Sequence, residues 1–416
     1  MPSLRNQTLE GNMQTREPVT YLDNNATTAC APEVIEAMLP CFAGNYGNAS
    51  SPHFLGRQAA RAVASAREKV AECIGCSPPD VYFASCATEA NNLVLLGVAH
   101  SQSVRRRVVV SAIEHKSVLG PCEALGAMGF DIVAVPVQSD GTINLAALRD
   151  AIDTQTLLVS IQGANNEVGT IQPVRAVADI AHEHGACVHC DAAQLLGKVP
   201  VSIDELGADF TTFSAHKAYG PKGVGILVER NRVKGVQIWP LQYGGGQENG
   251  LRPGTLNVPG IVGVGEAFRL CREHVYGDMV RTKSLRLQLE NGILSVVPRA
   301  RIVAHEASRL PGTVSILFPG VPADMLIART PSICLSRGSA CMSGTVAPSH
   351  VLLALGLSPD DARCVVRLSL GRYNTPGDVQ AAFRCISNAL EDSPEPESSQ
   401  PLRQVTSVGF TEEPAP

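Results

Sequence analysis

Apolar side chains recur along this chain in two rhythms. Between residues 55 and 70 they fall at every third or fourth position, at Leu55, Ala59, Val63, Ala66 and Val70. That spacing places them on one face and predicts an amphipathic helix. Further along, apolar residues gather into short runs bounded by turn or polar residues, a pattern typical of strands buried on both faces. The seven runs are Val81–Ala84, Val108–Ile113, Ile132–Val137, Leu157–Ile161, Cys187–His189, Phe210–Phe213 and Val224–Val228.

The order of these segments predicts the fold class. Seven short runs, most of them separated by helix-length segments, indicate an α/β protein with a mostly parallel seven-stranded sheet wrapped by helices. After about residue 276 we expect a long polar helix, strands near Thr313–Phe318 and Ile333–Leu335, and a final amphipathic helix near Val379–Leu390. These later elements predict a second, smaller α/β domain. Ligands of such folds bind beyond the carboxyl ends of the strands.

The two ends of the chain lack this patterning. Residues 1–18 are polar and aperiodic, and residues 393–416 are rich in Pro and Glu with few large apolar groups. Such segments cannot bury enough apolar surface to offset the entropy of ordering, so we predict that both are disordered. The predicted division is a disordered extension at 1–18, an N-terminal segment at 19–30 that packs with the small domain, a large domain at 31–276, a small domain at 277–392 and a disordered tail at 393–416.

The composition excludes several classes of protein. The 416 residues carry a formal net charge of −5, which leaves no basic footprint for nucleic acid or for an anionic membrane. No apolar run approaches the roughly 18 residues that span a bilayer. The first residues contain no apolar stretch typical of a secretory signal. We therefore expect a cytoplasmic protein that binds neither a membrane nor nucleic acid.

The cysteines argue for free thiols. Their number, 13, is odd, and they are scattered through a long chain, which disfavours a disulfide framework. Two C-x-x-C pairs, Cys73/Cys76 and Cys187/Cys190, suggest zinc as an alternative. However, the pairs lie far apart in the sequence, and positions i and i+3 of a strand face opposite sides of a sheet. We expect no metal site.

Polar clusters follow several of the predicted strands. The run Ser85–Asn92 is a small-residue turn that opens a helix, where backbone amides and the Thr88 hydroxyl suit a phosphate group. A plain helix N-cap explains the same residues. His115 follows the next strand and Asn166 a later one. A lone histidine is more often structural than catalytic, and the Asn residues could face a cleft or simply form a turn.

Asp191 and Lys217 end two neighbouring predicted strands. An acid and a lysine in these positions suit an enzyme that uses pyridoxal phosphate. The lysine forms a Schiff base, and the acid keeps the pyridine nitrogen protonated so that the ring accepts electrons. The alternative is a structural salt bridge, but that alternative does not explain why the phosphate donors Ser214 and His216 lie directly before the lysine.

Three further features carry candidate chemistry. Residues 244–255 form a glycine-rich stretch that ends in Thr255, which could also be a flexible connector. Cys341 lies among small polar residues, whereas most other cysteines lie in apolar runs, so we expect an exposed thiolate nucleophile there. Arg367 offers a guanidinium for a substrate carboxylate.

With these residues assembled, the chain resembles the cysteine desulfurases of the fold-type I pyridoxal phosphate enzymes. The resemblance runs from Tyr21 to about Thr375, and the Cys341 block is similar to that of the long-loop group, which often supplies sulfur for iron–sulfur clusters and tRNA. The matching blocks are YLDNNATT (21–28), FASCATEANN (83–92), EHKSV (114–118), NNEVGTIQPV (165–174), DAAQLLGK (191–198), SAHKAYGPKGVG (214–225), GGGQENGLRPGTLN (244–257) and SRGSAC (336–341).

The resemblance implies a role for each candidate near the cofactor. Lys217 would bind pyridoxal phosphate covalently, and Asp191 would pair with its ring nitrogen. Gln194 would hydrogen-bond the ring oxygen, while His115 would stack on the ring and assist proton transfer. Thr255 would reach the phosphate group from the partner subunit of a homodimer. Within the same subunit, the phosphate would be held by Ala87, Thr88, Ser214 and His216.

The resemblance also implies the reaction. Asn166 and Arg367 would hold the carboxylate of L-cysteine, and Cys341 would attack its sulfur. The products would be L-alanine and a persulfide on Cys341, for transfer to an acceptor protein whose identity the sequence does not give. Arg337 stands where the family usually has Ser or Thr, and we hypothesise that its charge lowers the pKa of Cys341 or selects an acidic acceptor.

Three other functions are weighed against this one. A selenocysteine lyase shares the RPGT block, and competition between cysteine and selenocysteine would separate the two activities. A non-catalytic sulfur carrier or assembly subunit is disfavoured by the joint presence of Lys217, Asp191, His115 and Cys341. A zinc or redox protein built on the C-x-x-C pairs is the weakest alternative.

Overall fold

A seven-stranded sheet forms the larger core of the protein. The computed structural model describes residues 19–101, 104–230, 233, 235–337 and 347–391. The predicted α/β class is confirmed. Five neighbouring strands run parallel, and β8 is antiparallel to both of its neighbours. In spatial order the strands are β2 (Val81–Ala84), β8 (Gly225–Glu229), β7 (Phe210–Ser214), β6 (Cys187–Asp191), β5 (Thr156–Gln162), β3 (Arg107–Ser111) and β4 (Asp131–Val135).

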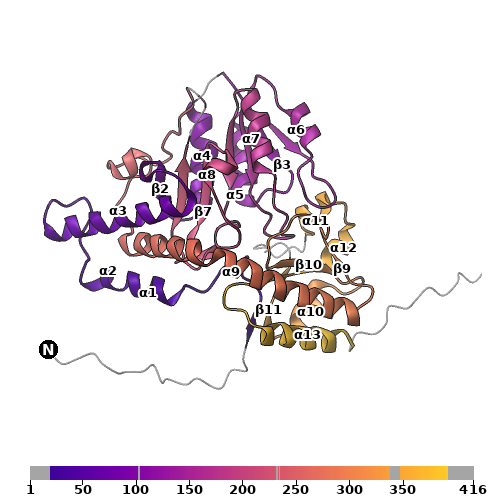
Figure 1. Ribbon diagram of the computed structural model, residues 1–416. Helices are drawn as coiled ribbons and strands as arrows, with labels where there is room; N and C mark the ends of the chain where they lie inside the picture. Colours follow the sequence, from indigo (N-terminus) through magenta and orange to yellow (C-terminus); the bar gives the residue numbers. More distant parts are fainter. Residues whose placement is uncertain (1–18, 102–103, 231–232, 234, 338–346, 392–416) are drawn as a thin grey trace, which may run out of the picture.

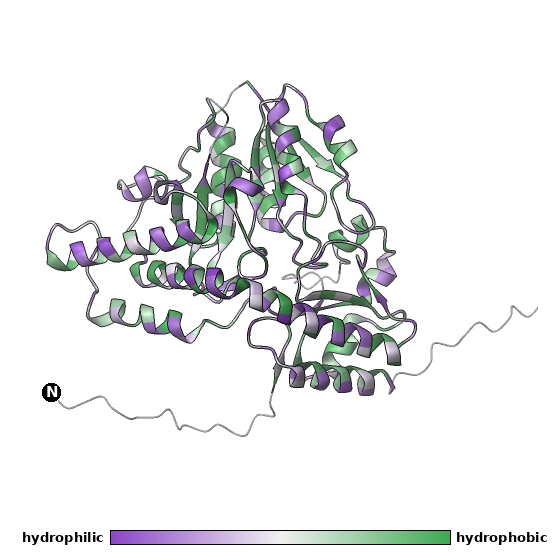
Figure 2. Ribbon diagram, viewed as in Figure 1, coloured by the Kyte–Doolittle hydropathy of each residue, from purple (hydrophilic) through white to green (hydrophobic). Residues whose placement is uncertain are grey.

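Helices cover both faces of this sheet (Figure 1). The apolar positions of the strands alternate between two separate cores, and the helices turn their hydrophobic sides toward the sheet (Figure 2). Cys187 belongs to one of these cores and Cys190 to the other, as expected for residues three apart in a strand. Over the whole described part of the chain, including the C-terminal part, the helices are α1 (Pro32–Met38), α2 (Pro40–Ala43), α3 (Phe54–Ile74), α4 (Ala87–Ser101), α5 (Lys116–Ala127), α6 (Leu145–Ala151), α7 (Val174–Glu183), α8 (Ile203–Leu206), α9 (Val258–Val296), α10 (Ala323–Arg329), α11 (His350–Ala354), α12 (Pro359–Arg363) and α13 (Pro376–Glu391). Short 3-10 turns are η1 (Pro78–Asp80), η2 (Ala215–Lys217) and η3 (Gln247–Gly250).

A smaller antiparallel sheet follows in the C-terminal part. Its order is β12 (Ser336–Arg337), β13 (Val365–Ser369), β10 (Thr313–Leu317) and β9 (Arg301–Ile302). The predicted strand near residue 313 is confirmed as β10. The strand predicted near residue 333 is β11 (Ile333–Cys334), which pairs not with β10 but with the N-terminal strand β1 (Thr20–Tyr21). Strand β13 was not predicted, although every one of its residues is buried.

Helix α9 joins the two cores. The sequence predicted a long helix only after residue 276, but α9 begins at Val258, where the Asn257 side chain accepts a hydrogen bond from the Gly260 amide. Its first half packs on the large sheet through Ile261 and Phe268, and its second half packs in the smaller core through Leu289. The predicted boundary between 276 and 277 falls inside this helix, and the domain division stays a prediction. The segments predicted to be disordered lie outside the described residues.

The imidazole of His189 is fully buried in the large sheet. We expect its burial to make the stability of the fold sensitive to acid. Its ring lies 2.8 Å from the Ser160 hydroxyl and 3.3 Å from that of Thr212. Burial lowers its pKa from the usual 6.5 to about 4. Between these values the unfolded chain binds a proton that the folded chain excludes, so stability falls as the pH drops below 6.5. At pH 5 the loss attributable to this group is about 2 kcal/mol.

Chemical unfolding at pH 7.5 and pH 5 tests this prediction. A His189→Gln variant is expected to lose less stability than the parent over that interval. His274 is exposed, so the control His274→Gln should keep the pH dependence of the parent. Equal pH dependence in the parent and the His189→Gln variant would place the acid sensitivity elsewhere.

Candidate active site

The carboxyl ends of β5, β6 and β7 open into a cavity of about 350 Å³. That size is within the range of small-ligand sites. Residue pairing between β6 and β7 sets Asp191 beside Thr212, so that the segments following both strands meet at one edge of the sheet. Ten of the residues singled out from the sequence line this cavity. They are Ala87, Thr88, His115, Asn166, Asp191, Gln194, Ser214, His216, Lys217 and Arg367.

Two of the sequence candidates are not placed there. Thr255 is exposed in the segment between η3 and α9 and is not among the residues that line the cavity of its own chain. Cys341 lies outside the described residues. The roles that the resemblance implies for these two residues therefore stay predictions.

Asp191 ends β6 as a buried carboxylate with fixed partners. Its Oδ2 accepts a hydrogen bond from Asn91 Nδ2 at 2.8 Å, and its Oδ1 accepts one from the Ala193 amide at 3.0 Å. Asn91 is itself fully buried in α4, and its Oδ1 accepts from the Thr212 hydroxyl. These bonds orient the carboxylate toward the cavity, where a cationic partner would stabilise its charge.

Lys217 presents its amine to the same cavity from the short turn η2 that follows β7. Burial lowers its pKa below 10.5, Asp191 partly opposes that shift, and Arg367 adds to it. An amine with a lowered pKa is deprotonated for a larger fraction of the time. It is therefore a better nucleophile and a better base than an exposed lysine.

His115 combines a structural bond with a ring that faces the cavity. It is the N-cap of α5, and its Nδ1 accepts a hydrogen bond from the Ser117 amide at 3.1 Å. Because Nδ1 is an acceptor, the neutral ring carries its proton on Nε2. Burial and, next, Lys217 lower the pKa of His115 below 6.5, so the ring is neutral at pH 7. The Ser117 hydroxyl accepts from Asn91, which links this histidine to Asp191.

The opposite end of the cavity suits a phosphate group. The N-terminus of α4 contributes Ala87 and Thr88, and the end of β7 contributes Ser214 and His216. Burial, followed by the positive charges of nearby lysines, lowers the pKa of His216 to about 4, so its ring is neutral at pH 7 and has one N–H to donate. The turn before α4 lies directly against Gly225, where an added Cβ would come within 2.3 Å of the Cys86 carbonyl carbon.

The donors and charges of this cavity fit pyridoxal phosphate. A carboxylate stands ready for the ring nitrogen, a buried amine for the aldehyde carbon, and a helix N-terminus with two polar side chains for the phosphate. The Cys86 sulfur accepts a hydrogen bond from the Glu89 amide at 3.4 Å and so satisfies one of the free amides at the start of α4.

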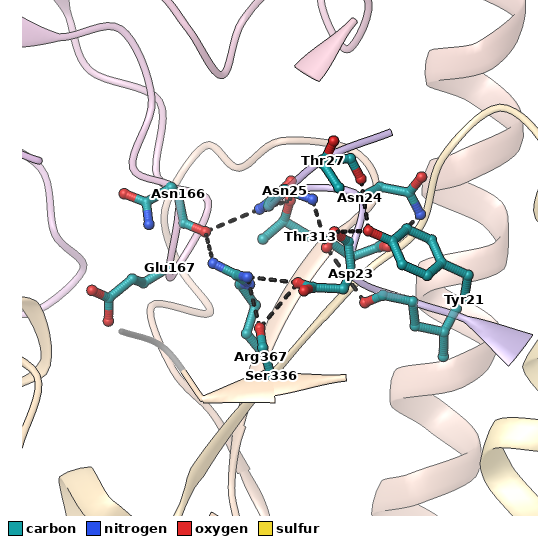
Figure 3. A network of polar contacts seen from close by, with 12 residues as sticks. Tyr21, Asp23, Asn24, Asn25, Thr27, Asn166, Glu167, Thr313, Ser336 and Arg367 are labelled. Carbon is teal, nitrogen blue, oxygen red and sulfur yellow. Dashed lines mark hydrogen bonds and ion pairs between the residues drawn. The ribbon is translucent and has the colours of Figure 1, made fainter. Parts of the chain in front are cut away.

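Arg367 lies at the side of the cavity that the smaller sheet contributes. Figure 3 shows its guanidinium between two sets of acceptors. Nη2 donates to Asp23 Oδ1 and to the Ser336 hydroxyl, both at 2.6 Å, and Nη1 donates to the Asn166 carbonyl at 3.0 Å. Its Nε is buried, and no partner for it is found among the described residues. Arg367 also lines the cavity, and a guanidinium at a cavity wall suits a carboxylate.

Asn25 anchors the N-terminal segment in the site. Its Nδ2 donates to the Asn166 carbonyl at 3.1 Å and to the Thr313 hydroxyl at 3.0 Å (Figure 3). Its backbone amide donates to Ser369 Oγ in β13. The sequence assigned no role to Asn25 or to Asn91, although both belong to the blocks that carry the resemblance. Their presence in those blocks was the sequence feature that could have identified them as site residues.

Arg337, whose charge we hypothesised to act on Cys341 or on an acceptor, forms an ion pair within the chain. Its Nε lies 3.1 Å from Asp324 Oδ1 in α10, so its charge is already paired. An ion pair with an exposed carboxylate weakens the field that a neighbouring thiol would experience. An effect of Arg337 on Cys341 or on an acceptor therefore requires this pair to open.

Comparisons with known proteins agree with this geometry. The model of the family "Aminotransferase class-V" matches residues 20–382. Cysteine desulfurase IscS of Anaeromyxobacter dehalogenans is 40% identical over 372 residues, covering 89% of this chain and 92% of that protein. The "probable cysteine desulfurase, mitochondrial" of Schizosaccharomyces pombe is 39% identical over 395 residues, covering 93% and 78% of the two chains.

A solved structure shows the same fold. A protein described as "NifS-like protein" superposes with a TM-score of 0.84 at 40% sequence identity, covering 90% of this chain and 99% of its own. Family model, relatives and fold thus agree with one another. The chain belongs to the cysteine desulfurase family, within the class-V aminotransferases.

Proposed function

We propose that this protein removes the sulfur from L-cysteine with the help of pyridoxal phosphate. The products are L-alanine and a persulfide on Cys341, which passes its sulfur to an acceptor protein. One observation carries the proposal, namely the convergence of Lys217, Asp191 and Arg367 on one cavity. An amine, a buried carboxylate and a guanidinium in this arrangement suit an amino acid substrate and a pyridine cofactor.

The cofactor is held by residues from four segments. Lys217 binds it covalently, Asp191 pairs with the ring nitrogen, and Gln194 donates to the ring oxygen. His115 provides a flat surface for the ring. When bound, pyridoxal phosphate supplies an electron sink that stabilises negative charge at the substrate's Cα. The phosphate contacts come from Ala87, Thr88, Ser214 and His216, with Thr255 contributed by the partner subunit of a homodimer.

The substrate is oriented by its carboxylate. Arg367 and Asn166 both line the cavity, and the Arg367 guanidinium would pair with the carboxylate. The lowered pKa of Lys217 would let its Nζ act as a base for the Cα proton of a bound substrate. The neutral His115 ring carries its hydrogen on Nε2, where it can donate a hydrogen bond into the cavity, because Nδ1 is engaged by the Ser117 amide.

Cys341 completes the reaction as the sulfur acceptor. Its thiolate attacks the sulfur of L-cysteine, so that an S–S bond forms while the C–S bond breaks. The electron pair of the broken bond stays with the carbon fragment, which becomes L-alanine after protonation. Ser336 and Arg337 are the last described residues before Cys341 in the sequence, and Ser336 accepts a hydrogen bond from Arg367.

A homodimer completes the site. The first helices expose large apolar side chains, among them Ile35, Leu39, Phe42 and Phe54, which is the composition of a surface that a second subunit covers. Thr255 is exposed and outside the cavity of its own chain. This placement suits a residue that acts across such an interface.

The compartment is less constrained than the chemistry. In the part of the chain that the structure describes, no helix has the length and apolar character needed to cross a membrane. The cytoplasmic location expected from the sequence stays a prediction, because the Schizosaccharomyces pombe relative is named mitochondrial. The identity of the sulfur acceptor is equally open to experiment.

Replacing Lys217 tests the proposal directly. The purified protein, incubated with pyridoxal phosphate and freed of excess cofactor, should show a visible absorbance band and form alanine from L-cysteine. A Lys217→Ala variant should lose the band and about 10²- to 10⁴-fold in alanine formation, because it lacks both the covalent attachment and the base. Lys222→Ala, which removes an exposed lysine, serves as the control. A parent protein that stays colourless would overturn the proposal.

Replacing Cys341 separates cofactor binding from sulfur transfer. A Cys341→Ala variant should keep the visible band and lose persulfide formation, because its cofactor residues are intact and its acceptor thiol is gone. Cys76→Ala removes another thiol as a control and should keep both properties. Persulfide retained on the Cys341→Ala variant, measured by mass spectrometry, would assign the acceptor role to another cysteine.

Gly225 tests the phosphate end of the site. A Gly225→Ala variant forces the Cys86 turn to move, because the new Cβ would overlap its backbone. We expect the affinity for pyridoxal phosphate to fall about tenfold or more, from a strain of about 1–3 kcal/mol. The control Gly277→Ala adds a methyl group where nothing lies within 4 Å. Unchanged cofactor affinity, measured by equilibrium titration of the apoprotein, would show that the phosphate does not depend on this turn.

A further inference from the structure

A second lysine lies behind the cavity wall. Lys198 does not line the cavity, but its Nζ donates to Gln194 Oε1 and, at 2.9 Å, to Asn25 Oδ1. No carboxylate lies within ion-pair distance of it in the described part of the chain. Its nitrogen is therefore bound by two amide oxygens that belong to the wall of the site.

Two backbone carbonyls fix the orientation of both amides. Gln194 Nε2 donates to the Asn25 carbonyl at 2.9 Å, and Asn25 Nδ2 donates to the Asn166 carbonyl at 3.1 Å. A carbonyl oxygen is always an acceptor, so the nitrogen of each amide must face it. Both side-chain oxygens then turn toward Lys198, which has hydrogens to donate.

The local fold brings this lysine under the glutamine. Gln194 and Lys198 are four residues apart in the turns that follow β6, where the Lys198 amide donates to the Leu195 carbonyl. Gly197 adopts a φ of +71°, and an added Cβ there would lie 2.9 Å from Cys271 Sγ in α9. The tight packing of this turn against α9 holds Lys198 in place.

If Lys198 served only to fill space, a lysine at this position would lower the stability of the fold. Burial lowers the pKa of Lys198, and the charges of Lys217 and Arg367 lower it further. A buried amine without an acidic partner destabilises the fold, and a neutral side chain of similar volume would fill the space at lower cost. What such a side chain could not do is donate hydrogen bonds to both amides.

We propose that Lys198 is the positioning residue that makes Gln194 present an N–H, rather than its oxygen, to the ring oxygen of the cofactor. The inference rests on the proposed function. Gln194 Nε2 carries two hydrogens, of which the Asn25 carbonyl takes one. Without Lys198, the Gln194 oxygen loses its donor, and the single bond from Nε2 to the Asn25 carbonyl is what still holds the amide in this orientation.

The absorbance of the bound cofactor, recorded against pH without cysteine, reports this contact. A donor at the ring oxygen stabilises its anionic form. In a Lys198→Met variant the pH midpoint of the absorbance change should therefore rise by about one unit, the effect of one hydrogen bond to a charged acceptor. Lys222→Met removes a lysine charge near the site from an exposed position and should leave the midpoint within 0.2 units, about the error of such a titration.

A double-mutant cycle separates positioning from a direct effect of charge. Gln194→Ala should shift the midpoint in the same direction, and Gln194→Ala/Lys198→Met should shift it no further. An unshifted midpoint in Lys198→Met, or additive shifts in the double variant, would overturn the inference. Should Lys198→Met fail to fold, Lys198→Gln keeps a polar group there, and we expect a smaller shift in the same direction, with no shift again overturning it.

The two proposals fail in different ways. A parent protein without a visible band after incubation with pyridoxal phosphate would overturn the proposed function and this inference together. A parent with the band and with cysteine-dependent alanine formation, whose Lys198→Met variant titrates like the parent, would overturn this inference alone.

Discussion

The pairing of β6 with β7 is the constraint on which the site depends. Asp191 and Lys217 come from segments that are distant in the chain, and the parallel register that pairs Asp191 with Thr212 brings both segments to one edge of the sheet. The strands are buried on both faces, so a shift of one residue would turn apolar side chains out of both cores. The cores on either side of the sheet thus fix the chemistry at its end. Asn91 adds to this arrangement, because it binds both Asp191 and Thr212.

The N-terminal segment connects the site to the smaller sheet. Asp23 and Asn25 contact Arg367, Asn166 and Thr313, which belong to different parts of the fold. Strand β1 meanwhile pairs with β11. A short stretch of chain therefore forms hydrogen bonds with polar groups from both parts of the fold. The orientation of Gln194 depends on the same stretch.

The sequence predicted the elements whose signal is local. The seven strands of the large sheet were visible as short apolar runs, and Asp191 and Lys217 were visible because each follows such a run. The antiparallel direction of β8 was not predicted, since an apolar run carries no information on direction. Strand β13 was missed although Val366, Leu368 and Leu370 alternate with polar residues, a strand pattern. The early start of α9 was missed although Val258, Ile261 and Val264 already follow helical spacing. The roles of Thr255 and Cys341 rest on the resemblance alone. Contacts such as that between Asn91 and Asp191 could not be predicted, because they arise only once the chain has folded.

Helix α9 runs through both cores of the protein. Its 39 residues form a rod of about 58 Å that is packed into both cores. Lys217 follows a strand of the large sheet and Arg367 lies in a strand of the smaller sheet, so one continuous helix packs against both of the layers that supply the amine and the guanidinium. The relative placement of the two sheets, and with it the distance between these two groups, therefore depends on the packing of a single helix.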